Sequence, residues 1–280
     1  MRILFYGHKG WIGQLVIQYW RKLYQEDELV FSNVKILPSN YNELESEFKN
    51  VNPDRIFSSV GRTFGNGINN IDYLEDKLQE NINDNLYAPI VLAQLSKKLS
   101  VHMSYIGTGC IFSRDTRVDK YEYTEEDVPD FFGSAYSTVK GYTDQLIKHF
   151  DNVLNFRIRM PIVDEDNSRN FITKIMSYEK INSMPNSMTY LPDLIPVMIQ
   201  MARMEKTGTY HMTNKGCIDH KEILDTLNHT NYLLIEQSEL PTKSKRSNNI
   251  LSTTKLESEI DLRHISDCIK DVQKSLKKSL

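Results

Sequence analysis

The first thirteen residues join a short apolar strand to a glycine-rich turn, and they constrain the fold more than any other stretch. RILFY at 2–6 is typical of a buried strand, and GHKGWIG follows with Gly7, Gly10 and Gly13 spaced three apart. A helical pattern begins at Trp11. Glycines at this spacing permit a tight turn and close approach of the backbone to a pyrophosphate at the helix N-terminus. The arrangement predicts a dinucleotide-binding βα unit; a glycine-rich turn without a ligand is the alternative.

Strand-length apolar runs alternate with amphipathic helical stretches through the first 160 residues or so. This alternation predicts an α/β fold, namely a Rossmann-type doubly wound parallel sheet covered on both faces. The expected strands are 3–6, 29–33, 55–60, 101–107 and 153–159, followed by 188–191 and 209–213. The expected helices are 11–24, 43–50, 82–99, 136–150 and about 193–204.

Domain organisation follows from the absence of any long linker rich in Pro, Gly or Ser. We expect an NADP-binding Rossmann domain at 1–162, to which about 187–215 return, and a smaller substrate-binding lobe that takes most of 163–280. The two lobes are therefore interleaved. The chain of 280 residues has room for one such α/β domain with a lobe, so that any second activity must share the first one's site.

Composition excludes several classes of function. A net charge of −3 provides no basic field for nucleic acid. The apolar run 191–204 is interrupted by Asp193 and Pro196 and is too short to span a bilayer, and strand-like residues directly after Met1 indicate no signal peptide. Three cysteines without metal-ligand spacing suit a reducing compartment. We expect a cytoplasmic protein without nucleic-acid or membrane partners.

The end of the second strand decides which nicotinamide cofactor is favoured. NAD enzymes usually place an acidic residue there, whereas this chain has Ser32-Asn33-Val34-Lys35. Lys9 and Lys35 can supply positive charge to a 2′-phosphate, so NADP(H) is predicted; the alternative is that both lysines are solvated surface residues. The turn residues expected to contact it are Gly7, His8, Lys9, Gly10, Trp11, Ile12 and Gly13.

Tyr136 and Lys140 form a Tyr-x-x-x-Lys pair, which places both side chains on one face of a helix. An ammonium group beside a phenol stabilises the phenolate, so Tyr136 can act as an acid or base near neutral pH. Thr108 follows the apolar strand 101–107, where a hydroxyl can hold a substrate carbonyl. The pair alone also occurs on ordinary helix surfaces.

Together, the glycine motif, Thr108, Tyr136 and Lys140 resemble an extended short-chain dehydrogenase/reductase. The resemblance implies that Tyr136 donates a proton to the carbonyl oxygen, Lys140 binds the nicotinamide ribose, and Thr108 orients the substrate. It also implies a scaffold and proton-relay role for Asn85 and a place on the adenine side for Gly61. All three of Asn85, Tyr136 and Lys140 are then cofactor contacts.

Longer strings give a closer resemblance over most of the chain. They are TGCIF from Thr108, EEDVPDFFGSAYSTVK from Glu125, RIRMPI from Arg157, RNFITKI from Arg169, PNSMTYLPDLIP from Pro185 and RSNN from Arg246. They resemble the UDP-4-keto-6-deoxy-glucose 3,5-epimerase/4-reductases of UDP-L-rhamnose synthesis, which are related to dTDP-4-dehydrorhamnose reductases. The match is poorest at 32–41.

This resemblance implies two activities in one pocket. Inversion at the 3 and 5 positions of a 4-keto sugar needs proton removal and return, and reduction then needs a hydride at the carbonyl. Cys110 lies two residues after Thr108, and strand alternation points both inward if the extended conformation continues. By resemblance, Cys110 and Lys174 are the epimerisation residues. The alternatives are a buried inert thiol and a solvated helix lysine.

Asn170 and Arg246 are the candidates for the nucleotide half of the substrate, because an amide can bond the sugar-phosphate region and a guanidinium can bind two phosphate oxygens. Arg246 lies in KSKRSNN, where a solvated charge run is the alternative. Substrate contacts are therefore expected from Thr108, Cys110, Asn170, Lys174 and Arg246. His211 and His220 are too isolated to form a metal site, so no metal is expected.

Two other functions remain open at this point. One is a reductase that acts on a sugar epimerised elsewhere, which Cys110 and Lys174 argue against. The other is a nucleotide-binding regulatory subunit without turnover, which intact Thr108, Tyr136 and Lys140 argue against. The preference for UDP over dTDP, and a homodimer formed through the helices 82–99 and 136–150, follow from the resemblance.

Overall fold

The computed structural model describes residues 1–119 and 121–278 and divides them into two compact units. Unit 1 comprises 1–107, 135–156 and 195–210. Its elements, including those that run on into unit 2, are β1 (Arg2–Tyr6), α1 (Trp11–Leu23), β2 (Glu28–Phe31), η1 (Pro38–Asn40), α2 (Tyr41–Val51), β3 (Arg55–Ser58), η2 (Ile71–Asp76), α3 (Leu78–Ile82), η3 (Asn83–Tyr87), α4 (Ala88–Lys98), β4 (His102–Thr108), α5 (Ala135–Ile147), β6 (Val153–Ile158), α7 (Leu191–Arg203) and β10 (Gly208–His211).

The six long strands form one sheet in the order β10-β6-β4-β3-β1-β2. β1 pairs in parallel with β2 and β3, and β3 pairs in parallel with β4. Consecutive residues of β1 are buried on alternate faces, as expected for a strand covered on both sides. The prediction of a Rossmann-type parallel sheet is confirmed, and the expected strands and helices lie within a few residues of the observed ones.

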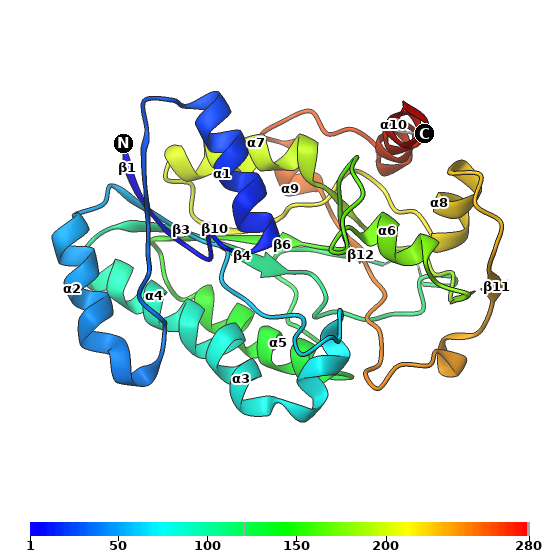
Figure 1. Ribbon diagram of the computed structural model, residues 1–280, viewed down its shortest axis with the longest axis horizontal. Coiled ribbons are helices and arrows are strands. Elements are labelled where there is room, and N and C mark those ends of the chain that lie inside the picture. Colours follow the sequence, from blue (N-terminus) through cyan, green and yellow to red (C-terminus); the bar gives the residue numbers. More distant parts are fainter. Residues whose placement is uncertain (120, 279–280) are drawn as a thin grey trace. The chain divides into compact units, whose positions relative to one another are not determined.

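Helices cover both faces of this sheet. In Figure 1, α1 and α7 lie over one face, and α2, α4 and α5 lie over the other. Trp20 of α1 packs edge-on against Phe57 of β3, with ring centroids 5.7 Å apart. On the other face, Leu4 and Tyr6 of β1 belong to a core cluster with buried residues of α2 and α4. This double cover leaves the strand ends and loops as the places where polar groups can bind ligands.

Unit 2 comprises 108–134, 157–194 and 211–280 apart from the residues that are not described. Its elements are β5 (Glu122–Tyr123), β7 (Pro161–Ile162), α6 (Phe171–Met176), β8 (Lys180–Ile181), β9 (Thr189–Tyr190), α8 (His220–Thr226), β11 (Leu233–Leu234), η4 (Gln237–Glu239), β12 (Ile250–Leu251), α9 (Thr254–Glu257) and α10 (Ile265–Lys278). Buried apolar side chains of α6, α8 and α10 form its main core.

The observed boundaries differ from the expected ones in two ways. The stretch 108–134, expected in the nucleotide-binding domain, groups with unit 2, because β5 pairs with β12 and the Phe112 and Tyr123 rings stack at 4.4 Å. The returning segment is 195–210 rather than about 187–215. Short pairings between segments far apart in sequence, which no local pattern reveals, cause both differences.

Candidate active site

The glycine turn has the geometry that a pyrophosphate requires. Gly7 has a φ of +82°, and a Cβ there would lie 2.7 Å from Ser59 Oγ. A Cβ on Gly13 would lie 2.3 Å from the Gly7 oxygen, so only glycine lets α1 start this close to the turn. Among the described residues no side chain caps α1, and its first turn has no acidic residue. These residues therefore fit the phosphates of a dinucleotide.

The side chains of this turn are only partly buried. His8, Trp11 and Ile12 are half-buried, and the His8 ring lies 5.3 Å from that of Phe31 at the end of β2. Lys9 is exposed. The predicted contacts of these side chains with a cofactor remain predictions.

A carboxylate stands near the end of β2, contrary to the reading of the sequence. Glu47 of α2 accepts hydrogen bonds from Ser32 Oγ at 2.8 Å and from the Tyr6 hydroxyl at 2.5 Å. No acidic residue stands at the usual spacing from the glycine motif, because this carboxylate comes from the following helix. Lys35 is exposed just beyond the strand. Charge at this corner is therefore mixed: Lys9 and Lys35 are exposed cations, and the Arg21 guanidinium lies 5.6 Å from the Phe31 ring centroid.

Tyr136 and Lys140 lie in the first two turns of α5, and both are buried. The Lys140 ammonium donates a hydrogen bond to the hydroxyl of Tyr105 and lies 4.7 Å from its ring centroid. Burial, with the nearby Tyr136 and Asp144, raises the pKa of Tyr105 well above its ordinary value, so this phenol stays neutral. Sequence reasoning missed Tyr105, whose signal was a phenol within a largely apolar strand.

Asn85 belongs to η3, a single π-helical turn between α3 and α4. Its side chain accepts a hydrogen bond from the Arg62 amide at 2.9 Å and donates one to the Arg62 carbonyl, and a Cβ on Gly61 would lie 3.2 Å from the same Asn85 oxygen. Its carbonyl accepts a hydrogen bond from Thr143 Oγ1 of α5 at 2.5 Å. Such π turns are frequent at functional sites. Asn85 thus links the strand end at Gly61 to the helix that carries Tyr136.

Thr108 is the last residue of β4, and Cys110 lies in a turn after it. The Cys110 amide donates to Thr108 Oγ1 at 3.1 Å. β4 ends at Thr108, so the extended conformation that strand alternation requires does not continue to Cys110. The two residues instead belong to a tight turn that is closed by the hydrogen bond to the Thr108 hydroxyl. A Cβ on Gly109 would lie 2.5 Å from a Leu251 methyl carbon, which explains the glycine between them.

Lys174 lies in the last turn of α6 and is half-buried. Burial, together with the positive charges of Arg169 and Arg246, lowers its pKa to about 8. A lysine of this kind can exchange protons near neutral pH. Arg246 donates to Ser244 Oγ at 2.7 Å, and the residues after it, 247–250, are buried. Lys243 and Lys245 are exposed and Arg246 is half-buried, so the solvated part of this stretch is its two lysines, and the role of Arg246 stays a prediction.

Asn170 caps α6, which corrects its predicted role. Its side-chain oxygen accepts from the amides of Ile172 and Val163, and its nitrogen donates to the carbonyls of Val163 and Glu165. These four bonds use the full capacity of an amide side chain, which is also 2% exposed. Asn170 therefore has no donor or acceptor left for a sugar phosphate.

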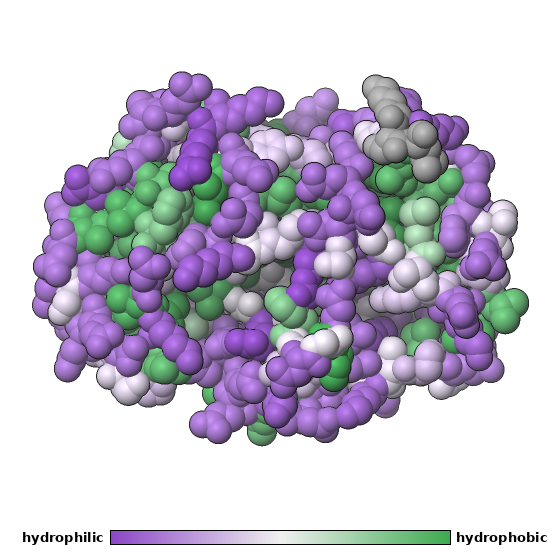
Figure 2. Space-filling view, in the orientation of Figure 1, coloured by the Kyte–Doolittle hydropathy of each residue, from purple (hydrophilic) through white to green (hydrophobic). Residues whose placement is uncertain are grey.

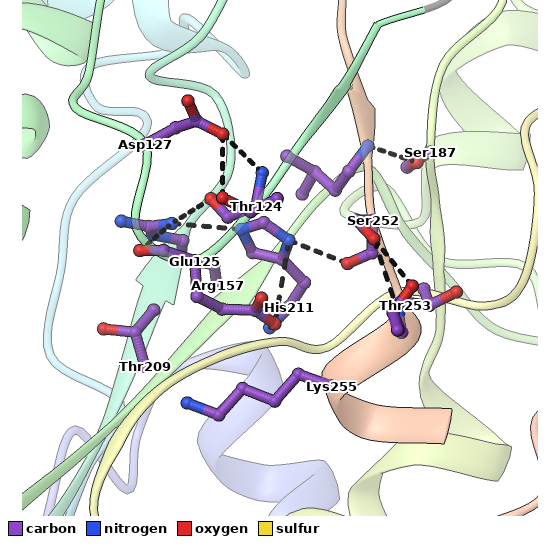
Figure 3. A network of polar contacts seen from close by, with 12 residues as sticks. Thr124, Glu125, Asp127, Arg157, Ser187, Thr209, His211, Ser252, Thr253 and Lys255 are labelled. Carbon is purple, nitrogen blue, oxygen red and sulfur yellow. Dashed lines mark hydrogen bonds and ion pairs between the residues drawn. The ribbon is translucent and has the colours of Figure 1, made fainter. Parts of the chain in front are cut away.

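Arg157 and His211 form a buried network in unit 2, shown in Figure 3. Arg157 donates to His211 Nε2 at 3.0 Å and to the Glu125 carbonyl at 3.3 Å, while His211 Nδ1 lies 2.9 Å from the Ser252 carbonyl. Burial, and then Arg157, lower the pKa of His211 to about 3. His211 is thus a neutral link between the segments at 125 and 252, with no sign of a ligand role.

The other two cysteines are Cys268 and Cys217. Burial raises the pKa of Cys268 to about 12, and its thiol faces Asp193. Cys217 is half-buried, and none of the three cysteines forms a disulfide bond. In the part of the chain that the structure describes, no three His, Cys, Asp or Glu side chains gather as a metal site, and no helix could cross a membrane. The molecular face drawn in Figure 2 is mostly hydrophilic with separate apolar patches.

The glycine turn, the sheet order and the Tyr136–Lys140 helix together define the class of extended short-chain dehydrogenase/reductases. A family model described as the RmlD substrate binding domain matches residues 1–278, and the chain belongs to this family. The predicted resemblance is confirmed.

Three known proteins illustrate this membership. The chain is 47% identical over 270 residues to protein L780 of Acanthamoeba polyphaga mimivirus, covering 92% of each chain. The crystal structure of that protein, described as a UDP-rhamnose synthase, superposes with a TM-score of 0.93 over 98% of this chain and 99% of that one, at 43% identity. A bifunctional dTDP-4-dehydrorhamnose 3,5-epimerase/reductase of Arabidopsis thaliana is 35% identical, covering 91% of this chain and 86% of that one. A dTDP-4-dehydrorhamnose reductase of Bacillus anthracis in complex with NADP, 18% identical with a TM-score of 0.79 over 99% of each chain, shares the fold.

Proposed function

We propose that this chain converts a UDP-4-keto-6-deoxy-glucose to UDP-L-rhamnose by 3,5-epimerisation followed by NADPH-dependent reduction of the 4-keto group. The observation that carries the epimerase half is Lys174, a half-buried lysine whose pKa is lowered to about 8, in the same unit as Cys110. A reductase alone needs neither residue. The viral and plant relatives named above support the same pair of reactions.

In the reduction, Tyr136 donates a proton to the carbonyl oxygen while Thr108 holds that oxygen by a hydrogen bond. When bound, the nicotinamide cofactor supplies the hydride. Lys140 holds positive charge beside Tyr136 on α5 and thereby stabilises the phenolate that forms as the proton leaves. The neutral Tyr105 hydroxyl anchors that ammonium without cancelling its charge.

In the epimerisation, Cys110 and Lys174 exchange protons with the carbons that flank the carbonyl. Each inversion passes through an enolate, whose oxygen Tyr136 and Thr108 stabilise. Arg246 binds the substrate diphosphate, since a guanidinium can bond two phosphate oxygens at once.

Product analysis tests the proposal directly. We expect the protein, given UDP-4-keto-6-deoxy-glucose and NADPH, to form UDP-L-rhamnose and to consume one NADPH for each product molecule. A product with the D-configuration retained at positions 3 and 5 would limit the chain to reduction. Comparing the UDP and dTDP sugars at equal concentration measures the base preference.

NADPH should bind at least about tenfold more tightly than NADH, a difference of about 1.4 kcal/mol, because Lys9 and Lys35 can meet a 2′-phosphate. Both are exposed near the turn and the end of β2. Fluorescence titration with each cofactor measures the two dissociation constants. In the double variant Lys9→Ala/Lys35→Ala, the ratio of the NADH to the NADPH dissociation constant should be smaller than in the unmodified protein. Lys22→Ala, an exposed lysine in the last turn of α1, is the control. Equal affinities in the unmodified protein would contradict the prediction.

The epimerisation rate should depend on pH through Lys174. Its pKa of about 8 means that the fraction of neutral amine rises with pH up to that value. If Lys174 removes a proton from carbon, deuterium exchange at low substrate concentration should increase about tenfold per pH unit below 7 and level off above about 8. Lys174→Arg, which stays charged, should lose this rise at one position. A flat profile in the unmodified protein would contradict Lys174 as the base.

A homodimer through α5 and its neighbours is also proposed. Tyr142 and Leu146 of α5 are 54% and 46% exposed, and Leu78 of the contacting α3 is 57% exposed. Replacing Tyr142 and Leu146 by Asp should convert the dimer to a monomer in light scattering, since charges in an apolar interface are strongly unfavourable. Leu23→Asp, on α1 and 45% exposed, should leave the mass unchanged. A monomeric unmodified protein would contradict the proposal.

A further inference from the structure

Arg159 is a buried guanidinium that contacts the sulfur of Cys110. It directly follows β6, is 1% exposed, and donates from Nη1 to Cys110 Sγ at 3.4 Å. The same nitrogen donates to Ser247 Oγ at 3.1 Å, and Nη2 donates to the Ser247 carbonyl at 2.6 Å and to the side-chain oxygen of Asn186. The guanidinium is thus held rigidly beside the thiol.

The groups that hold Arg159 are themselves fixed. Ser247 Oγ donates to the Phe112 carbonyl at 2.6 Å, and Asn249 donates from its side chain to Ser247 Oγ at 3.0 Å and to the Gly109 carbonyl at 2.9 Å. These bonds join the turn that carries Cys110 to the segment at 247–249. The position of the guanidinium relative to the sulfur is therefore determined by both segments.

Among the described residues, no carboxylate accepts a hydrogen bond from the Arg159 guanidinium. Its acceptors are neutral oxygens and the sulfur of Cys110, and its Nε is buried without an acceptor there. A buried cation without an acid is costly, and an unsatisfied buried donor calls for a reason other than packing. Cys110 is the one acceptor of this set that can become negatively charged.

His220, at the start of α8, is a further titratable group that interacts with Arg159. Burial lowers its pKa to about 4, with Arg159 a smaller contributor. His220 is therefore neutral near pH 7 and does not offset the charge of Arg159.

We propose that Arg159 is the positioning residue of Cys110, which orients its sulfur and stabilises the negative charge on it during proton exchange with the sugar. The proposal rests on the epimerase function proposed above. In the step, the C–H bond next to the carbonyl breaks, its proton forms an S–H bond with the anionic sulfur, and its electron pair passes into the enolate. A proton delivered to the opposite face completes the inversion, and Cys110 returns its own proton to solvent.

Arg157 supplies a matched control. It is a second buried guanidinium, two residues earlier on β6, and its bonds go to His211 and to backbone carbonyls instead of a thiol (Figure 3). Replacing either arginine removes a buried cation from the same short segment, at the end of β6 or directly after it. Only Arg159 should affect the chemistry of Cys110.

The test is alkylation of Cys110 by iodoacetamide between pH 6 and 9, in protein with NADPH but no sugar, followed by mass spectrometry of the Cys110 peptide. Arg159→Gln should slow this reaction at pH 7 by about tenfold or more, with recovery at higher pH, because the thiolate loses its counter-charge. Arg159→Lys, which keeps the charge, should stay within about threefold of the unmodified protein. Arg157→Gln should also stay within this range, and Cys217 in the same samples reports any general change.

Thermal unfolding and NADPH binding establish that each variant is folded. If Arg159→Gln is folded and alkylates Cys110 at the original rate, or if Arg159→Lys is as slow as expected for Gln, the proposal is wrong. If Arg159→Gln does not fold, Arg159→Lys alone tests the proposal. Alkylation of Cys110 within about threefold of the unmodified protein supports it, and alkylation slowed about tenfold contradicts it. The alkylation assay contains no sugar, so it tests Arg159 independently of epimerisation. If the alkylation rate of Cys110 depends on Arg159 but the protein exchanges no deuterium with the sugar, the epimerase function is contradicted and the effect of Arg159 on the thiol stands.

Discussion

Tyr136→Phe is expected to lower the rate of 4-keto reduction by about a hundredfold or more, because the substitution removes the phenolic hydroxyl that donates the proton, and general acid catalysis contributes about 10²- to 10⁴-fold. The ring occupies a buried position on α5 that Phe can fill. The variant should therefore remain folded and bind NADPH normally. The measurement is the initial rate of NADPH oxidation with a UDP-4-keto sugar already in the L-configuration, so that epimerisation does not limit the rate.

Tyr142→Phe is the matched control for this experiment. It removes a phenolic hydroxyl from the same helix but keeps the aromatic ring that the proposed dimer interface uses, and it should leave the rate within about twofold. Retention of more than about a tenth of the rate by Tyr136→Phe would exclude Tyr136 as the main proton donor.

The sheet could be predicted because its evidence is local. Strands such as 2–6 are apolar on both faces, and the glycine turn between β1 and α1 needs no distant partner to be read. The helix that carries Tyr136 and Lys140 was located by its own periodicity within a few residues. The long expected helix 82–99 differs: its first part contains the π turn η3, because the Asn85 carbonyl bonds to Thr143 on another helix.

The parts of the site that escaped prediction depend on distant partners. Glu47 contacts the end of β2 from the following helix, so its position cannot be predicted from a fixed spacing after the glycine motif. From the sequence alone, an asparagine that caps a helix cannot be told from one that binds a substrate, because both use the side-chain amide. The hydrogen bonds of Asn170 to the loop at 163–165 show that its donors and acceptors are already used. Arg157 and Arg159 did leave a signal, since charged residues in a buried strand need polar partners. Those partners, at 109–125 and 247, are far away in sequence.

The second large effect separates the two proposed chemistries. Cys110→Ala should slow proton exchange at one or both carbons that flank the carbonyl by about a hundredfold, the lower end of general acid–base contributions, while reduction of a sugar already in the L-configuration is spared. Tyr136, Lys140 and NADPH suffice for reduction, whereas exchange needs a further acid or base. Cys110 fits this role because Thr108 closes the turn that presents it and Arg159 contacts its sulfur.

The exchange step can be isolated by incubating the UDP-4-keto-6-deoxy sugar with the protein and NADP⁺ in deuterated water, because no hydride is then available. The unmodified protein should introduce deuterium at positions 3 and 5, which NMR distinguishes. Cys110→Ala and Lys174→Met should each lose exchange at one or both positions, and the pattern assigns each residue to its carbon. Cys217→Ala, which removes a second half-buried cysteine outside any disulfide, should exchange both positions normally. If Cys110→Ala does the same, the thiol of Cys110 only packs, and another acid must act in its place.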